Sequence, residues 1–287
     1  MNVIIPGNKR YSYPIAGGLG AQIFGAATAF YLRGLGNVVN VDLTYFDLPP
    51  FSALEGATGI PSVWCWELNQ LGIEKREVSA NAVNQGGGQV TPSVGWLSAV
   101  SSLALQDPRV LSRFTIPSIE KIESELQLSI RLSEPYTAVH LRRGDYLNCS
   151  SFVVPSSAAY DCAYRAGRYV RNLLIVSDSG VDAAQLKDLY QKFSAIDVIT
   201  NKAISPVTLW ALFTYATVLV TSNSQFSLSA GYFSNGVVFS PDQYVGNGDR
   251  ISNTLYKRTT PFFLYKASRQ DFGSPEREVS LLEMAHQ

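Results

Sequence analysis

Two arginines and a histidine stand together in "YTAVHLRRGDYL" (136–147), directly after an apolar run. Guanidinium groups grip phosphate through paired hydrogen bonds, so this segment has the chemistry to hold a phosphorylated ligand. Side chains alternate along a strand, which puts His140 and Arg142 on one side and Arg143 on the other. We therefore expect one arginine in a ligand crevice and the other turned to Asp145 or to backbone carbonyls.

The same segment contains Arg-Gly-Asp, a tripeptide known as an adhesion signal. A solvated loop with a local Arg–Asp pair would also account for these residues. The adhesion interpretation is the weakest of the three, because so short a pattern occurs by chance.

A second candidate anion site is "TSNSQFSLS" (221–229), which runs from an expected strand into an expected helix. Free N–H groups at a helix start, together with small hydroxyls, bind anions. An ordinary N-cap at Ser224 explains the segment equally well.

The glycine-rich "GGLGAQIFG" (17–25) matches a dinucleotide-binding fingerprint only in part. Gly18 and Gly20 fit the pattern, but Ile23 replaces the third glycine. Asp42, at the end of the next expected strand, would suit a ribose. A glycine turn that lets a helix pack closely is an equal alternative.

Composition excludes several classes of protein. The net charge is zero, which argues against a general affinity for nucleic acid, although 15 arginines against 8 lysines favour specific phosphate sites. Three cysteines without a CxxC pattern, and only two histidines, argue against a disulfide framework or a zinc site. No Asp-x-Asp occurs, so the usual metal grip on a nucleotide diphosphate is missing.

Hydrophobic segments predict a soluble protein. The longest apolar stretch, 207–220, is too short to span a bilayer, and the N-terminal apolar run is too short for a signal peptide. We expect a cytoplasmic location.

The second half alternates strands with helices, which predicts a parallel sheet covered on both faces. The expected strands are 136–141, 173–178, 195–199, 217–221 and 236–240. The expected helices are 157–168, 181–193, 205–216 (capped by Ser205, with Pro206 first) and 224–233.

The first half opens in the same way, with a strand at 2–7, a loop and helix at 18–36, and a strand at 38–43. A helix at 117–132 carries an apolar face of Ile119, Ile122, Leu126 and Ile130. A boundary near 134 then separates two α/β domains, 1–134 and 135–287, with the tail 261–287 left free to pack back on the first.

Ligands of parallel sheets bind beyond the carboxyl ends of the strands. The polar residues of the second half collect at such ends: His140, Arg142, Arg143 and Asp145 after one strand, Ser177 and Asp178 after the next, and Ser222, Asn223, Ser224 and Gln225 after the fourth. They are therefore expected at one edge of one sheet.

These segments resemble the α-1,2-fucosyltransferases of glycosyltransferase family 11. The central His-x-Arg-Arg-Gly-Asp-Tyr signature is intact as "HLRRGDY" (140–146). The other motifs of the family correspond, in order, to "GGLGAQIFG", "VDLTYFD", "SDS", "NSQFSLS" and "VVFSPDQY", over residues 15–244.

The resemblance implies a GT-B-like fold, in which two Rossmann-like halves hold the site in the cleft between them. The first domain would face the acceptor, and the second would bind a GDP-sugar. The implied reaction is inverting, metal-independent transfer of L-fucose from GDP-fucose to a glycan hydroxyl, typically on galactose. No cofactor is implied beyond the donor substrate, and peripheral contact with a membrane is left open.

The resemblance also assigns roles to residues. Arg142 and Asp145 are the predicted catalytic residues, and Arg142 would bind the β-phosphate. His140 and Asp178 would contact the guanine or its ribose. The remaining predicted donor-binding residues are Arg143, Ser222, Asn223, Ser224, Gln225, Phe226, Gly18, Gly20 and Gln22.

Two departures from the family pattern keep alternatives open. Ala21 stands where the family has asparagine, in the loop expected near the reacting sugar. Leu228 and Ser229 replace two tryptophans. The alternatives are transfer of another GDP-sugar, a GDP-binding protein that has lost transfer and, more distantly, a dehydrogenase.

Overall fold

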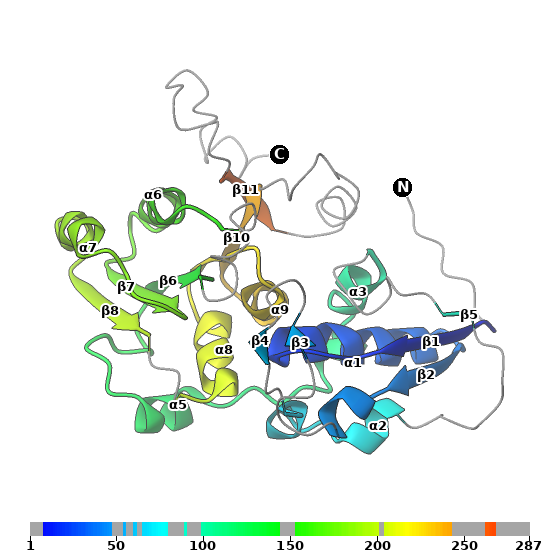
Figure 1. The fold of residues 1–287 in the computed structure, drawn as a ribbon. Helices are drawn as coiled ribbons and strands as arrows, with labels where there is room; N and C mark the ends of the chain where they lie inside the picture. The colour runs from blue at the N-terminus through cyan, green and yellow to red at the C-terminus, as the bar shows by residue number, and fades with distance from the viewer. Residues whose placement is uncertain are drawn as a thin grey trace. The chain divides into compact units, whose positions relative to one another are not determined.

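The structure is a computed structural model that describes residues 8–47, 54–55, 60–61, 65–79, 89–90, 99–143, 153–200, 204–242 and 262–267. Over these residues the chain divides into two compact units, the first running to Ile116 and the second beginning at Pro117 (Figure 1).

The first unit is built on a parallel sheet with the order β2-β1-β5. Its strands are β1 (Arg10–Pro14), β2 (Val38–Asp42) and β5 (Gln89–Val90), and α1 (Leu19–Gly34) connects β1 to β2. The other elements of the unit are η1 (Thr44–Asp47), the antiparallel pair β3 (Leu54–Glu55) and β4 (Ile60–Pro61), η3 (Leu68–Leu71), α2 (Lys75–Ser79), α3 (Ala99–Ala104) and α4 (Pro108–Leu111).

Small residues let α1 lie close to the sheet. A Cβ on Gly25 would come within 2.5 Å of the Ile15 side chain. The Tyr13 hydroxyl donates to the Gly25 carbonyl oxygen at 2.7 Å. The alternative interpretation of the glycine segment, close packing of a helix, therefore holds for this glycine.

The first strand differs from the prediction. The predicted segment, 2–7, lies outside the described residues, and the strand that pairs with β2 is β1. The prediction followed the most apolar run, whereas β1 contains alternating tyrosines, of which Tyr13 is buried opposite Val41. Aromatic residues at every second position suit a half-buried strand.

The second unit holds a six-stranded, entirely parallel sheet with the order β11-β10-β9-β6-β7-β8 (Figure 1). Its strands are β6 (Tyr136–Leu141), β7 (Asn172–Ser177), β8 (Ala195–Ile199), β9 (Val218–Val220), β10 (Val237–Asp242) and β11 (Phe263–Lys266). The chain runs outward from β6 to β8, returns to β9 beside β6, and runs outward again. This is the strand order of doubly wound nucleotide-binding sheets.

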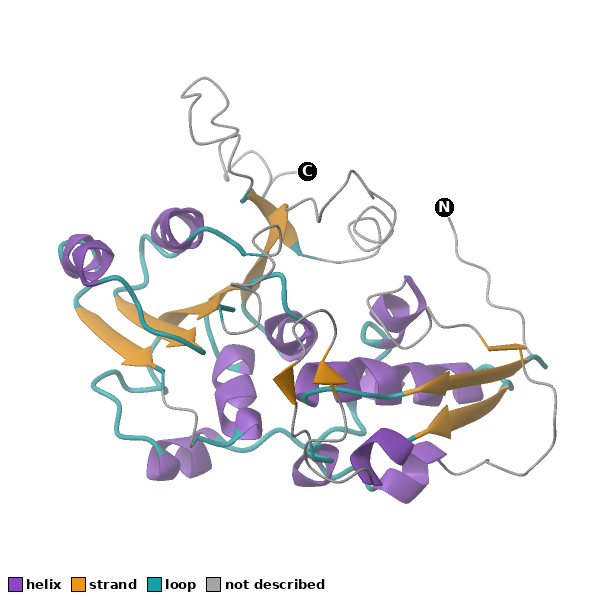
Figure 2. Cartoon of the chain, viewed as in Figure 1, coloured by secondary structure: helices purple, strands orange, loops and turns teal. Residues whose placement is uncertain are grey.

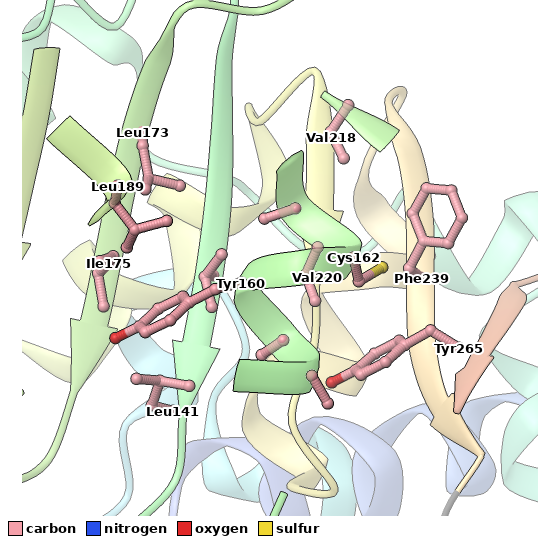
Figure 3. Packing of buried hydrophobic residues seen from close by; sticks show 14 of the residues in the cluster. Leu141, Tyr160, Cys162, Leu173, Ile175, Leu189, Val218, Val220, Phe239 and Tyr265 are labelled. Carbon is pink, nitrogen blue, oxygen red and sulfur yellow. The ribbon is translucent and has the colours of Figure 1, made fainter. Parts of the chain in front are cut away.

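Helices cover both faces of this sheet (Figure 2). They are α6 (Ser156–Ala166), α7 (Ala183–Tyr190), α8 (Pro206–Thr214) and α9 (Gln225–Phe233). Side chains of α6 and α7 pack on a cluster that includes Leu141, Ile175 and Val220 (Figure 3). The predicted α/β class, with a parallel sheet in each half, is confirmed, and every strand predicted in the second half is present.

The helix predicted at 117–132 is shorter than expected. α5 spans Ile119–Glu125, and Leu126 is already extended. Backbone N–H groups of Ser129 and Ile130 donate to the Asp197 carboxylate at 3.1 and 2.8 Å. A carboxylate from β8 thus replaces the helical hydrogen bonds. Of the four predicted apolar residues, Ile122, Leu126 and Ile130 are buried and Ile119 is half-buried.

Contacts of residues 117–125 explain why the division between the two units falls before the predicted boundary near 134. The Tyr215 hydroxyl donates to the Pro117 carbonyl oxygen at 2.9 Å. The Thr208 hydroxyl donates to the Glu125 carboxylate. Residues from 117 onward therefore belong with the helices of the second unit.

Candidate functional site

The candidate site lies where the chain reverses its direction of winding in the second unit. β6 pairs with β7 on one side and with β9 on the other, and all three strands run parallel. Their carboxyl ends therefore meet at one edge, and ligands of doubly wound sheets bind at this switch point. The predicted gathering of polar residues at one sheet edge is confirmed for the described residues.

His140 is buried at the end of β6 and held by two hydroxyls. Its Nδ1 lies 2.8 Å from Ser222 Oγ and 2.8 Å from Ser227 Oγ. The imidazole also contacts the rings of Phe213 and Phe226, with centroids 5.3 and 5.6 Å away. Burial, and then the charges of the neighbouring arginines, lower the pKa of His140 to about 3, so the ring is neutral at physiological pH.

Ser227 and Phe213 are site residues that sequence reasoning missed. The Ser227 hydroxyl contacts His140 and accepts from the Ser222 N–H at 3.2 Å. Ser227 belongs to the quoted 221–229 segment and lies one helical turn after Ser224, so helical spacing was an available signal. Phe213 comes from α8, and nothing in the local sequence links it to His140.

Arg142 reaches the end of the neighbouring strand. Its Nη1 lies 2.7 Å from Asp178 Oδ2, and both side chains keep about a quarter or less of their surface exposed, 25% and 21%. The other oxygen of Asp178 accepts from the Arg143 N–H at 2.6 Å. Asp178 therefore fixes the chain after β6 and orients the Arg142 guanidinium, a contact that the sequence did not predict.

Arg143 turns away from this cluster, as the alternation predicts. Its guanidinium donates to the Arg142 carbonyl oxygen at 3.1 Å and to Ser156 Oγ at 2.6 Å. The predicted backbone-carbonyl partner is thus present. Asp145, the other predicted partner and a predicted catalytic residue, lies outside the described residues.

α9 begins at the same edge. The Ser224 hydroxyl accepts from the Phe226 N–H at 3.3 Å, so the predicted N-cap is confirmed. Gln225 Nε2 is buried and has no hydrogen-bond partner. Asn223 is half-buried between the strand and the helix. A helix that starts at the same sheet edge as Arg142 offers N–H donors to a phosphate group.

The two residues that replace tryptophans lie inside the fold. Leu228 is buried. The Ser229 hydroxyl accepts from Trp210 Nε1 at 3.0 Å and donates to the Phe226 carbonyl oxygen at 2.9 Å. A tryptophan from α8 therefore hydrogen-bonds to Ser229, one of the two positions at which the sequence departs from the pattern it resembles.

The predicted donor-binding residues of the first unit lie at the start of α1. Gly18 is the N-cap residue and Gly20 is buried within the first turn. Gln22 is buried, and its amide nitrogen donates to the carbonyl oxygens of Gly17 and Cys65 at 3.1 and 2.8 Å. Ala21 is the third residue of α1 rather than a loop residue, which corrects the predicted position.

Gln22 and Glu67 together join α1 to the segment before η3. The Gln22 amide oxygen accepts from the Glu67 N–H at 2.9 Å. These backbone contacts account for Gln22 without a ligand. The Glu67 carboxyl accepts from the Leu19 N–H at the start of α1, yet burial raises its pKa to about 7.

The described residues contain no group of three or more His, Cys, Asp or Glu side chains that could hold a metal ion. Within the same residues, no helix is both long and apolar enough to cross a membrane.

No protein-family model matches the sequence, and no curated protein matches it. Several solved structures are similar. POFUT1 in complex with GDP is 11% identical with a TM-score of 0.43, covering 85% of this chain and 100% of that one. A family 9 glycosyltransferase from Veillonella parvula is 10% identical with a TM-score of 0.41, covering 83% and 81%. The E. coli heptosyltransferase WaaC with ADP is 12% identical with a TM-score of 0.40, covering 96% and 98%. Because each TM-score is below 0.5, these similarities do not assign an activity to this chain.

Proposed function

We propose that this protein is a glycosyltransferase that moves L-fucose from GDP-fucose to a hydroxyl of a galactose-containing glycan, with inversion and without a metal ion. The observation that carries the proposal is the position of His140 and Arg142. Both belong to the intact "HLRRGDY" signature, and both lie at the switch point of the sheet, where β9 leads into α9.

The diphosphate would be held by Arg142 and the start of α9. As the bond to fucose breaks, negative charge grows on the β-phosphate. A guanidinium that is already oriented stabilises this charge without a cation, and so do the free N–H groups at a helix start. The ion pair with Asp178 supports this role because it fixes the guanidinium before the ligand binds.

His140 would contribute as a neutral hydrogen-bonding group. Its low pKa excludes an imidazolium at physiological pH, so it would not neutralise phosphate charge. Its buried ring is held by Ser222 and Ser227 and suits a contact with the guanine or ribose. Asp178, the other residue expected there, already binds Arg142 and the Arg143 backbone.

Two alternatives have specific observations behind them. Leu228 and Ser229 occupy the positions of the family's tryptophans, which favours a different GDP-sugar in a reshaped pocket. Ala21 cannot supply the hydrogen bonds of the asparagine that the family carries. A protein that binds GDP without transferring a sugar would fit that change.

A donor screen tests the proposal. Calorimetry with GDP, UDP and ADP should show binding of GDP well ahead of the other two, because the guanine edge pairs the O6 acceptor with N1–H and N2–H₂ donors, an arrangement that neither uracil nor adenine has. Mass spectrometry should then detect fucosylated product from GDP-fucose and a β-galactoside. Product from GDP-mannose alone would favour the first alternative, and GDP binding without product the second. Equal affinity for GDP and UDP would contradict all three.

A further inference from the structure

A second set of polar groups lies on the opposite face of β6 from His140. Arg143 follows Leu141 in the alternation of the strand, and Leu141 packs in the cluster beneath α6 (Figure 3). The Arg143 guanidinium extends to the start of α6, where its Nη2 lies 2.6 Å from Ser156 Oγ. This set is therefore separate from the residues that contact His140.

The start of α6 carries positive charge that its own residues do not offset. The helix has 11 residues, its N-cap residue is Pro155, no side chain caps it, and its first turn contains no acidic residue. The N-terminus of a helix carries a partial positive charge. A guanidinium at the same place adds a full positive charge, so the two features repel each other unless an anion joins them.

The nearby carboxylates are engaged elsewhere. Asp178 accepts from the Arg143 N–H and pairs with Arg142. Asp182 caps α7 by accepting from the N–H groups of Ala184 and Gln185 at 2.7 and 3.3 Å. The Arg143 guanidinium therefore has only neutral acceptors among the described residues, a hydroxyl and a carbonyl oxygen.

Tyr160 adds an unused donor at the same place. Its side chain is 5% exposed, and its hydroxyl is buried without a hydrogen-bond partner. Tyr160 lies one turn after Ser156, and helical side chains lean toward the N-terminus of their helix, so the ring reaches back over the first turn. In Figure 3 the hydroxyl lies on the side of Leu141 and Ile175, away from Cys162.

Tyr160 and Arg143 are close enough for the guanidinium charge to oppose the rise in the tyrosine pKa that burial causes. That pKa is about 12, so the hydroxyl keeps its proton and can only donate to an anion at physiological pH. Three donor groups, the Arg143 guanidinium and the Ser156 and Tyr160 hydroxyls, thus lie near one helix start. The carboxylates whose charges act there, Asp178 and Asp182, are hydrogen-bonded to other groups.

We propose that the start of α6 binds a phosphate-type oxyanion, held by the Arg143 guanidinium, the Ser156 hydroxyl, the Tyr160 hydroxyl and the free N–H groups of the helix. The bound group is tetrahedral and carries at least one negative charge, which matches one guanidinium and two hydroxyl donors at a helix start. It is either free phosphate or a phosphate of a nucleotide, and the two sources can be separated by experiment.

Thermal unfolding with inorganic phosphate tests the site on the full chain. Phosphate should raise the Tm of the wild-type protein in a saturable way. Tyr160→Phe removes only the hydroxyl. It should weaken the binding of phosphate by about tenfold or more, as loss of a hydrogen bond to a charged group does. Without phosphate, the Tm of Y160F should equal or exceed that of the wild type, because the lost hydroxyl was unpartnered. Tyr164→Phe, on the exposed side of the same helix, is the matched control and should respond to phosphate as the wild type does.

Saturating GDP distinguishes the two sources. If phosphate still raises the Tm when GDP is saturating, the site takes a second anion. If GDP removes the phosphate response and Y160F also binds GDP about tenfold more weakly, the diphosphate is the occupant. The proposal is overturned if phosphate does not stabilise the wild type, or if Y160F and the wild type respond to phosphate alike. These readouts measure anion binding alone, so they do not depend on fucose transfer.

Discussion

Arg142 is held by Asp178 through a 2.7 Å ion pair before any ligand binds. A lysine at this position would keep the charge but lose the planar fork. If the fork stabilises charge on the leaving diphosphate, Arg142→Lys should lower kcat by roughly 10²- to 10³-fold, as the loss of a comparable transition-state donor does. GDP affinity should fall less. Initial rates with GDP-fucose and a β-galactoside, together with GDP titration, measure both effects.

Arg165→Lys is the matched control for this substitution, because Arg165 pairs with Asp161 on the exposed surface of α6. It should leave both quantities unchanged. Wild-type turnover in Arg142→Lys would remove Arg142 from the catalytic site.

Glu67 gives the first unit a distinct dependence on pH. Its pKa is raised from 4.5 to about 7, so between these values the folded state binds more protons than the unfolded state. Stability then falls as pH rises through this window, and the loss is complete above pH 7. Glu67→Gln removes the titrating carboxyl. The Tm of this variant should therefore exceed that of the wild type at pH 8 but not at pH 4.5.

The difference in Tm between variant and wild type isolates Glu67 from the opposite trend expected of His140, whose pKa is lowered. Glu74→Gln, an exposed acid on the same stretch of chain, serves as the control and should show no such difference. A constant difference in Tm from pH 4.5 to 8 for Glu67→Gln would show that the carboxyl does not titrate in this window.

At the scale of elements, the return from α9 to β10 depends on one close approach. A Cβ on Gly236 would come within 2.2 Å of the Ala216 carbonyl oxygen and 2.6 Å of the Thr217 carbonyl oxygen. Backbone atoms cannot move aside without disturbing β9, so Gly236→Ala should lower the free energy of unfolding by about 2 kcal/mol or more. Urea denaturation measures this change.

Gly34 is the matched control, because a Cβ there meets nothing within 4 Å and the residue ends α1. Gly34→Ala should raise stability by roughly 0.5–1 kcal/mol, since alanine is the better helix former. If both alanine variants behave alike, the strand start at β10 is not packed as the structure has it.

At the scale of the whole molecule, the proposed reaction relies on arginines and helix starts in place of a cation. The sequence contains no Asp-x-Asp, and its guanidinium groups outnumber its lysines, 15 to 8. GDP binding and sugar transfer should therefore survive excess EDTA. Calorimetry and product formation in the presence of the chelator measure this, and loss of function that manganese restores would contradict a metal-independent mechanism.

Much of the second unit could be predicted from local sequence. Apolar runs of five or six residues, separated by helical periodicity, identified β6 to β10, and Ser205 and Ser224 cap the helices that they were expected to cap. Alternation also separated Arg142 from Arg143 correctly. These features depend on neighbours within a few residues, and for that reason a sequence reports them.

Other features depended on contacts between distant segments, and only the tertiary structure decided them. The order of the six strands places β9 beside β6, which brings Ser222 and Ser227 to His140 across more than eighty residues of chain. The Asp197 carboxylate accepts from the N–H groups of Ser129 and Ile130, which lie 68 and 67 residues away in the sequence. The chain therefore leaves the helix soon after α5 ends. Helical periodicity in the sequence cannot predict this end of the helix, because the hydrogen-bond acceptor belongs to a distant strand. The sequence by itself thus determined the strands, the helix caps and the sides to which Arg142 and Arg143 turn, whereas the sheet order determined which polar residues meet.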